Sequence, residues 1–245
     1  MNYPTKIQKE KEKLHSLHGT GKLQYIWDYY KLPLLILFIV LYIIIYTLYG
    51  HFTHKDNILY TAFVNVACSE QLTTQLSTDF LDWLEEDTSK KEIYLYEGLY
   101  LTEQESSAHA QYIYASRMKI LASIDSEQLD VVFMNQEACD AFSQNGYLCN
   151  LEEALSTENF VLYEKIKPAL VTNTVILEDN LEEIQLDSSV TYEAVTSEYP
   201  MGLNLSHTKL FENAGFDDTV YLGIIANSPR IDTATMYLTY LFENE

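Results

Sequence analysis

The stretch that decides the fold is "DVVFMNQEACDAFSQNGYLCNLEEAL", residues Asp130–Leu155. Its opening run is apolar and β-branched, which predicts a short strand buried on both faces. Asn135 can cap the helix that follows, and Ala138 and Phe142 are spaced to share its buried side. The Gly-Tyr-Leu sequence at 146–148 then predicts a turn. The stretch as a whole predicts a strand, a short helix, a turn and a further helix.

Two strand-helix units precede this stretch. "NILYTAFVNVA" (Asn57–Ala67) is rich in β-branched and aromatic residues, which predicts a buried strand, and Ser69 can cap the helix after it. The apolar stripe expected on that helix is Leu72, Leu76, Phe80, Trp83 and Leu84. "EIYLYEGLYL" (92–101) predicts a second strand, interrupted at Gly98. A second helix is predicted over "SSAHAQYIYASRMKILASI" (106–124), with a buried stripe that includes Tyr114, Met118 and Leu121.

The order β-α-β-α-β predicts a parallel sheet with helices on its faces and the first strand between the second and the third. Beyond it, the region 156–217 is less regular. "TNTVILED" (172–179) and "VTYEAVT" (190–196) predict two strands with an acidic, solvated run between them. A turn is expected at Pro200-Met201-Gly202, because proline and glycine favour turns.

The C-terminal part of the sequence returns to a regular pattern. A short helix is predicted near Lys209, and the apolar run Val220–Ala226 predicts a strand that joins the same sheet. A helix that begins at Pro229 should cover one face of that sheet. Its expected apolar stripe is Ile231, Ala234, Leu238 and Leu241. Everything from about residue 57 onward is predicted to be one domain.

The N-terminal part contains "LPLLILFIVLYIIIYTLYG", residues 32–50. From Leu32 to Tyr49 there are 18 residues without a charge, which gives roughly 27 Å of helix, close to the thickness of a bilayer core. A buried core helix and a cleaved signal peptide are the alternatives, but no small-residue cleavage site follows the run. The sequence therefore favours an uncleaved, single transmembrane helix over residues 32–50.

Charge is distributed unevenly on the two sides of this helix. Residues 1–31 contain six lysines and three acidic residues, whereas the rest of the chain, with nine Lys and Arg and 33 Asp and Glu, carries a net charge of −24. Segments rich in Lys and Arg next to a transmembrane helix usually stay in the cytoplasm. We therefore expect a basic cytoplasmic tail over 1–31 and an extracytoplasmic domain over 51–245, attached to the cell membrane.

Three segments carry a resemblance to a known family: residues 58–84, 129–155 and 221–243. Together they resemble the extracellular solute-binding proteins of ABC importers, the two-lobed type whose lobes are joined by crossing strands. The resemblance implies a three-layer α/β lobe of the periplasmic-binding-protein type. Members of that family place a large second lobe between the second and third segments, where this chain has about 62 residues (156–217). We therefore expect a reduced second subdomain and incomplete burial of any ligand.

The sequence gives no indication of catalysis. Gly-x-Ser-x-Gly, His-Glu-x-x-His and Cys-x-x-Cys are all absent, so we expect no catalytic residues, no cofactor and no metal site. The net charge of −21 argues against nucleic acid as a partner. Of the three cysteines, Cys139 and Cys149 are nearest in sequence, and both a bridge between them and three buried free thiols are compatible with the pattern.

A binding site, where one exists, should lie beyond the carboxyl ends of the parallel strands, where helix N-termini offer free N–H groups. The candidate ligand-binding residues at these positions are Asn65, Cys68, Ser69, Glu97, Asn135, Gln136 and Glu137. Tyr96, with Tyr94 and Tyr100, could add an aromatic platform. Helix capping and core packing are the structural alternatives for the same residues.

Two functions are consistent with these features. The first is a membrane-anchored, solute-binding-like module that presents a small solute or peptide to a transporter permease, or senses it. The second is a non-catalytic interaction or assembly protein that uses the lobe as a scaffold for another membrane protein. In either case the acidic surface favours neutral or cationic partners.

Overall fold

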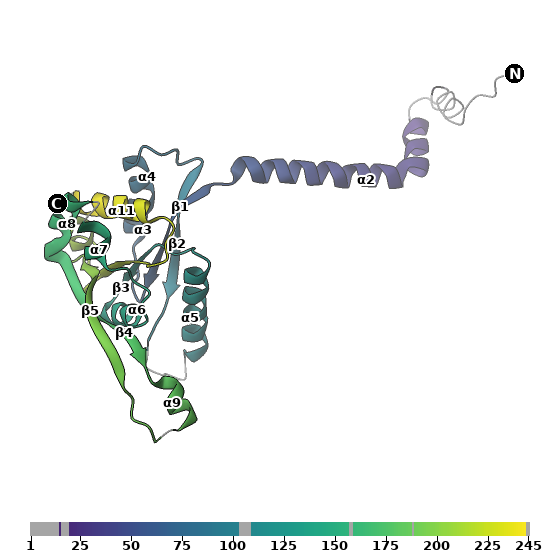
Figure 1. Cartoon of the computed structure of the whole chain (residues 1–245). Helices are drawn as coiled ribbons and strands as arrows, with labels where there is room; N and C mark the ends of the chain where they lie inside the picture. Colours follow the sequence, from purple (N-terminus) through teal and green to yellow (C-terminus); the bar gives the residue numbers. More distant parts are fainter. Residues whose placement is uncertain (1–14, 16–19, 103–108, 157–158, 188, 244–245) are drawn as a thin grey trace. The chain divides into compact units, whose positions relative to one another are not determined.

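The computed structural model describes residues 15, 20–102, 109–156, 159–187 and 189–243 (Figure 1). The chain divides into two compact units, Met1–His54 and Lys55–Glu245. The first unit contains helix α2 (Thr20–Thr53), with Pro33 inside it. This helix begins within the stretch 1–31 that the sequence assigns to the basic tail.

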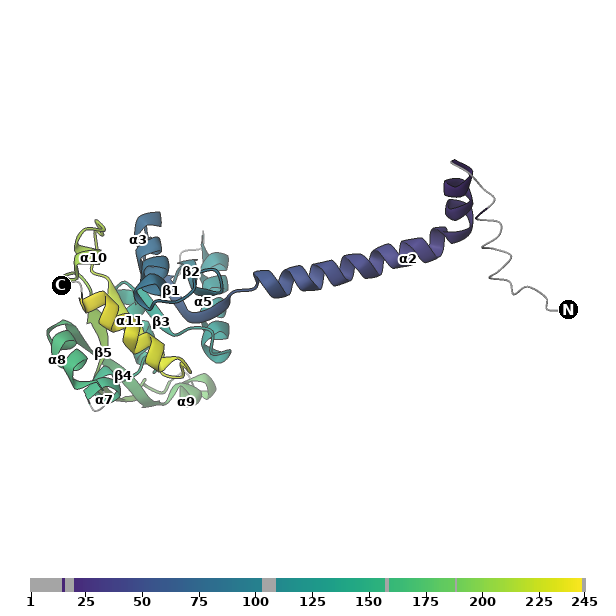
Figure 2. The same ribbon diagram turned by 90° about the horizontal axis from the view of Figure 1, so that it is seen from above.

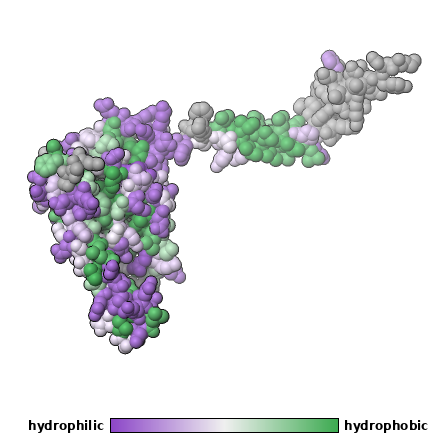
Figure 3. Space-filling model, viewed as in Figure 1, coloured by the Kyte–Doolittle hydropathy of each residue, from purple (hydrophilic) through white to green (hydrophobic). Residues whose placement is uncertain are grey.

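Within α2, the segment Lys31–Gly50 has a mean hydropathy of 2.6, and it is long and apolar enough to cross a membrane. Its side chains are exposed or half-buried throughout, and Figure 3 shows them as a continuous hydrophobic surface. A helical segment of this length and hydropathy is consistent with a membrane anchor.

The second unit is built on one mixed six-stranded sheet in the order β2-β1-β3-β6-β5-β4. The strands are β1 (Asp56–Val64), β2 (Lys91–Leu99), β3 (Val131–Met134), β4 (Leu170–Asp179), β5 (Ala194–Asn204) and β6 (Tyr221–Ile224). β1 pairs in parallel with both β2 and β3, while β6, β5 and β4 follow as antiparallel neighbours. The predicted position of the first strand between the second and third is confirmed, and so is the joining of the C-terminal strand to the sheet.

Helices cover both faces of the sheet (Figure 2). Leu59 and Phe63 of β1 belong to one core, while Ala62 and Val64 belong to the other, as the alternation of a strand requires. The first core is covered by α3 (Glu70–Thr74), η1 (Gln75–Asp79), α4 (Phe80–Trp83), α7 (Leu151–Ser156), α8 (Phe160–Ile166), α10 (Lys209–Glu212) and α11 (Ile231–Glu243). The second core is covered by α5 (Ala110–Asp125) and α6 (Gln136–Gln144).

The described part of the helix predicted over 106–124 is present as α5, and residues 106–108 lie outside the described residues. Its predicted buried stripe is wrong at Tyr114 and Met118, while Leu121 is half-buried. Tyr114 and Met118 are 65% and 46% exposed, and the buried side chains of the helix are Ser116, Ile120, Ser123 and Ile124. Two serines occupy positions facing the sheet, where their small side chains allow close packing. A hydrophobic pattern cannot reveal a contact face that is half serine.

The stripe predicted on the first helix is only partly correct, because the helix contains a π-helical turn. Leu72, Leu76 and Phe80 are buried, but Trp83 is 38% exposed. The wider turn of η1 shifts the register, so Leu81 becomes the next buried residue. Tyr237 and Tyr240 of α11 stabilise this turn, because their hydroxyls donate to the carbonyls of Leu76 and Gln75, each at 2.8 Å.

The region 156–217 does not form a separate subdomain. Its strands β4 and β5 pair with each other over most of their length and extend the main sheet. The turn predicted at Pro200-Met201-Gly202 is wrong, because these residues lie inside β5. The register of β4 and β5 shifts at Thr172, so the strand accommodates Pro200 at an irregular position of the ladder. The acidic run between the strands contains helix α9 (Leu181–Leu186).

A buried ion pair ties the amino end of β3 to the loop that leads into α11. Asp130 is fully buried and accepts hydrogen bonds from the Tyr60 amide at 2.7 Å and the Ser228 hydroxyl at 2.6 Å. Arg230 Nε lies 2.8 Å from the same carboxylate, and its guanidinium stacks 4.7 Å from the ring centroid of Tyr60. Residues about 70 to 100 positions apart in sequence are thus joined at one point.

Candidate functional site

The carboxyl ends of β1 and β3 are joined by two of the predicted binding residues, Asn65 and Asn135. Asn65 has a positive φ of 58°, and its side-chain nitrogen Nδ2 donates to Asn135 Oδ1 at 3.1 Å. The same side chain donates to the Leu101 carbonyl at 2.6 Å and accepts from the Leu101 amide at 2.8 Å. Asn135 also caps α6 by accepting from the Ala138 amide at 3.0 Å. Both side chains therefore hold three segments of the chain together.

The other predicted polar residues at this edge also have intramolecular partners. Ser69 caps α3 by accepting from the Leu72 amide at 3.2 Å, as predicted. Glu137 accepts from the Thr102 hydroxyl at 2.6 Å. The remaining two contacts lie nearer the surface: Thr73 Oγ1 is 3.4 Å from Glu97 Oε1, and Gln136 Nε2 is 2.7 Å from Asp140 Oδ1. The Ser69 contact matches the capping alternative, and ligand binding by these residues stays a prediction.

The three cysteines all lie in the described part of the chain and are free thiols. Burial, together with the nearby carboxylate of Glu97, raises the pKa of Cys68 to about 12. Burial likewise raises the pKa of Cys139 and of Cys149 to about 12. Such thiols are protonated at neutral pH, so they are poor nucleophiles and poor metal ligands. Within the described residues, no group of three or more His, Cys, Asp or Glu side chains could hold a metal ion.

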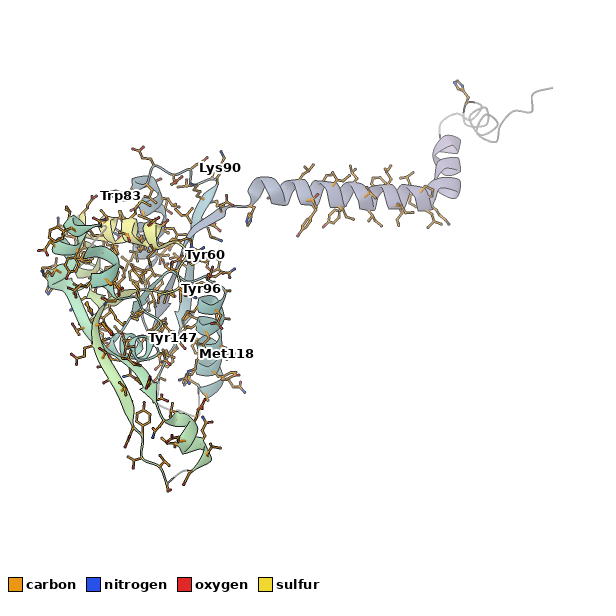
Figure 4. The ribbon with its side chains drawn as sticks, in the orientation of Figure 1. Tyr60, Trp83, Lys90, Tyr96, Met118 and Tyr147 are labelled. Atoms are coloured by element: carbon orange, nitrogen blue, oxygen red, sulfur yellow. The ribbon has the colours of Figure 1, made fainter. Side chains whose placement is uncertain are left out.

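The three tyrosines of the predicted aromatic platform do not present a common surface. Tyr96 is 8% exposed and packs edge-on against Tyr94, with ring centroids 4.7 Å apart. Lys119 of α5 places its Nζ 5.0 Å from the ring of Tyr96, and Tyr96 is labelled in Figure 4. Tyr94 and Tyr100 are 43% and 42% exposed. Tyr96 is thus mainly a core residue that anchors α5 on β2.

One cavity of about 370 Å³ lies between α5 and α6. Leu101, Ile120, Phe142 and other apolar groups form much of its wall, and Arg117, Glu137, Asn145 and Tyr147 supply polar groups. Of the predicted binding residues, only Glu137 reaches it. Arg117 and Tyr147 also line this cavity, although the sequence does not predict it. A charged residue on a helix, such as Arg117, normally indicates only the solvated side of that helix.

A second hollow of about 630 Å³ lies between the α3–η1 helix and α10. Its lining is mostly polar and includes Ser69, Gln75, Asp79, Lys209 and Asn213. Ser69 is the only predicted binding residue there. The structure therefore distributes the predicted site over separate places: Asn65 with Asn135, Glu137 in the first cavity, and Ser69 in the second.

Comparison with known proteins adds no relative. No family model matches the sequence, and neither a curated protein nor a solved structure matches it.

Proposed function

We propose that this chain is a membrane-anchored, non-catalytic module that binds another protein. The observation that carries this proposal is the form of the region 156–217. Where a two-lobed receptor needs a second wall, this chain has a projecting β-hairpin with exposed leucines and acidic side chains. Meanwhile, the polar side chains at the strand ends are engaged with one another. A protein surface is a better match to such a molecule than an enclosed solute.

We further propose that the N-terminus lies in the cytoplasm and the unit Lys55–Glu245 outside it. The lysine-rich stretch 1–31 before the apolar segment and the acidic composition after that segment support this orientation. Protease added to intact cells should then remove the C-terminal unit and spare an epitope tag placed at residue 1. Protection of the whole chain would contradict the proposed orientation.

A second candidate function is the capture of a small amphipathic solute, which the cavity between α5 and α6 favours. Its volume of about 370 Å³ lies at the lower end of the range of ligand pockets, and its wall combines apolar side chains with Arg117 and Asn145. This solute-binding function corresponds to the resemblance to importer receptors. It requires the cavity to close over its ligand or to bind it weakly.

One pair of measurements separates the two functions. The full-length chain in neutral phosphatidylcholine nanodiscs is titrated by calorimetry with amino acids, sugars, oligopeptides and polyamines. In parallel, membranes of the source cell are cross-linked and solubilised in mild detergent, and the size of the species that contains this 28.3 kDa chain is measured. The interaction module predicts no submicromolar solute and a discrete larger complex. A submicromolar solute together with a monomeric chain would overturn it.

A further inference from the structure

The hairpin of β4 and β5 has a base that is packed and a distal part that is not. Near the base, Val175 and Met201 are buried, and Asn173 Nδ2 lies 3.2 Å from Cys139 Sγ and 3.1 Å from Ser143 Oγ of α6. β5 pairs with β6 only at Leu203 and Asn204. Beyond that point β5 has β4 as its strand partner, and the two run together away from the rest of the sheet (Figure 1). We call residues 176–187 and 189–198 the arm.

The tip of the arm has a defined conformation. Asn180 fastens its two sides: its Nδ2 donates to the Thr191 carbonyl at 2.9 Å, and its Oδ1 accepts from the Glu193 amide at 2.8 Å. Asp179 Oδ1 accepts from the Leu181 amide at 3.1 Å at the start of α9. These hydrogen bonds fix the backbone on the two sides of the tip relative to each other.

The surface of the arm combines apolar and acidic side chains. Five large apolar residues are exposed to between 48% and 90%: Leu177, Leu181, Leu186, Tyr192 and Val195. The arm contains seven acidic residues and no Lys or Arg: Glu178, Asp179, Glu182, Glu183, Asp187, Glu193 and Glu198. Figure 3 shows hydrophobic and hydrophilic surface next to each other at this end of the unit. Two-stranded ribbons are marginally stable without a further covering layer.

We infer that the arm is a docking surface for a partner protein that presents an apolar patch surrounded by lysines and arginines. This inference rests on the proposed function and names the surface and the partner chemistry. A second copy of the chain is disfavoured as the occupant, because two arms would bring together seven acidic residues each. An anionic lipid surface is disfavoured for the same reason. A neutral polar partner would leave the leucines uncovered.

The test uses the full-length chain in phosphatidylcholine nanodiscs and defined fluorescent peptides. The probe is an 18-residue amphipathic helix with leucine on one face and lysine on the other. One control peptide replaces each leucine by serine at the same charge, and another replaces each lysine by glutamate. Anisotropy is measured at 0.15 M salt, where long-range attraction between exposed charges is largely screened. The leucine-lysine peptide should bind at least tenfold more tightly than either control.

Two arm variants and one matched control then locate the binding. The charge variant is Glu178→Gln, Glu182→Gln and Glu183→Gln, and the apolar variant is Leu181→Ser and Leu186→Ser. The control removes three exposed acids elsewhere, through Glu153→Gln, Glu212→Gln and Asp217→Asn. Both arm variants should weaken binding at least tenfold, and the control should change it less than twofold. Equal losses in arm and control variants, or no loss in the arm variants, would overturn the inference.

The same variants separate this inference from the proposed function. Each is expressed in the source cell, and the size of the cross-linked complex is measured as above. Loss of the complex in both arm variants, with retention in the control, supports the docking surface. A complex that survives both arm variants would refute the docking surface but leave the proposed function standing. All substituted side chains are exposed, so the thermal midpoints of the variants should be unchanged. An unchanged midpoint shows that the domain of that variant is still folded.

Discussion

Removal of the Asp130 carboxylate should destabilise the C-terminal unit more than any surface substitution. In Asp130→Ala, three donors lose their acceptor: the Tyr60 amide, the Ser228 hydroxyl and Arg230 Nε. Removing one partner of a buried ion pair costs about 3–5 kcal/mol. The Arg230 side chain keeps 25% of its surface exposed and can be partly rehydrated, so we expect a loss near the lower end, about 3 kcal/mol.

Urea unfolding measures this loss. Trp83 reports on the folded domain, and Trp27→Phe removes the second tryptophan, which lies in the other unit. Arg230→Met alone, and together with Asp130→Ala, completes a double-mutant cycle. The double variant should lose less than the sum of the single losses, because no charge is then left without its partner. A loss below about 1 kcal/mol in Asp130→Ala would refute the view that this carboxylate organises the amino edge of the sheet.

Three further predictions concern the core and the backbone. The cysteine thiols, whose pKa is raised from 9.0 to about 12, should resist iodoacetamide at pH 8 in the folded chain and react with it within minutes in 8 M urea. In alkali, the free energy of unfolding should fall between about pH 9 and pH 12, because the thiols of the unfolded chain ionise at a lower pH than those of the folded chain. Gly98→Ala should lower the free energy of unfolding by about 1–2 kcal/mol, because Gly98 has a φ of +67°, and a cost near zero contradicts this. Tyr237→Phe should lower the free energy of unfolding by about 1–3 kcal/mol, because the Leu76 carbonyl in the π-helical turn loses the tyrosine hydroxyl as its donor. Thermal unfolding measures this loss, and a smaller loss contradicts the prediction.

The parts of the fold that the sequence predicted correctly are those with strong local signals. β1 and β3 are continuous apolar runs, and Ser69 and Asn135 are caps followed directly by helices. The order of these elements was enough to place the first strand between its two parallel neighbours. Local propensity and sheet connectivity agree at these positions, so no distant contact was needed to predict them.

The errors arise where a distant contact decides the structure. Pro200 reads locally as a turn, but pairing with β4 keeps it in a strand with an irregular register. Trp83 is partly exposed because a π-helical turn shifts the register of its helix, and that turn is stabilised by two tyrosines of α11, far away in the sequence. The candidate site was affected in the same way. Asn65 and Asn135 were correctly expected at one edge, but the sequence could not reveal that they would bind each other.

The strand order also constrains when the protein can fold during synthesis. β6 lies between β3 and β5, yet it is translated after both of them. Until Tyr221–Ile224 has left the translation machinery, the parallel half of the sheet and the β4–β5 hairpin have no strand between them. Arg230, which closes over Asp130, emerges later still. The nascent domain therefore remains open, with its central sheet edge unpaired, until β6 has been synthesised, and an unpaired strand edge is prone to pairing with other chains.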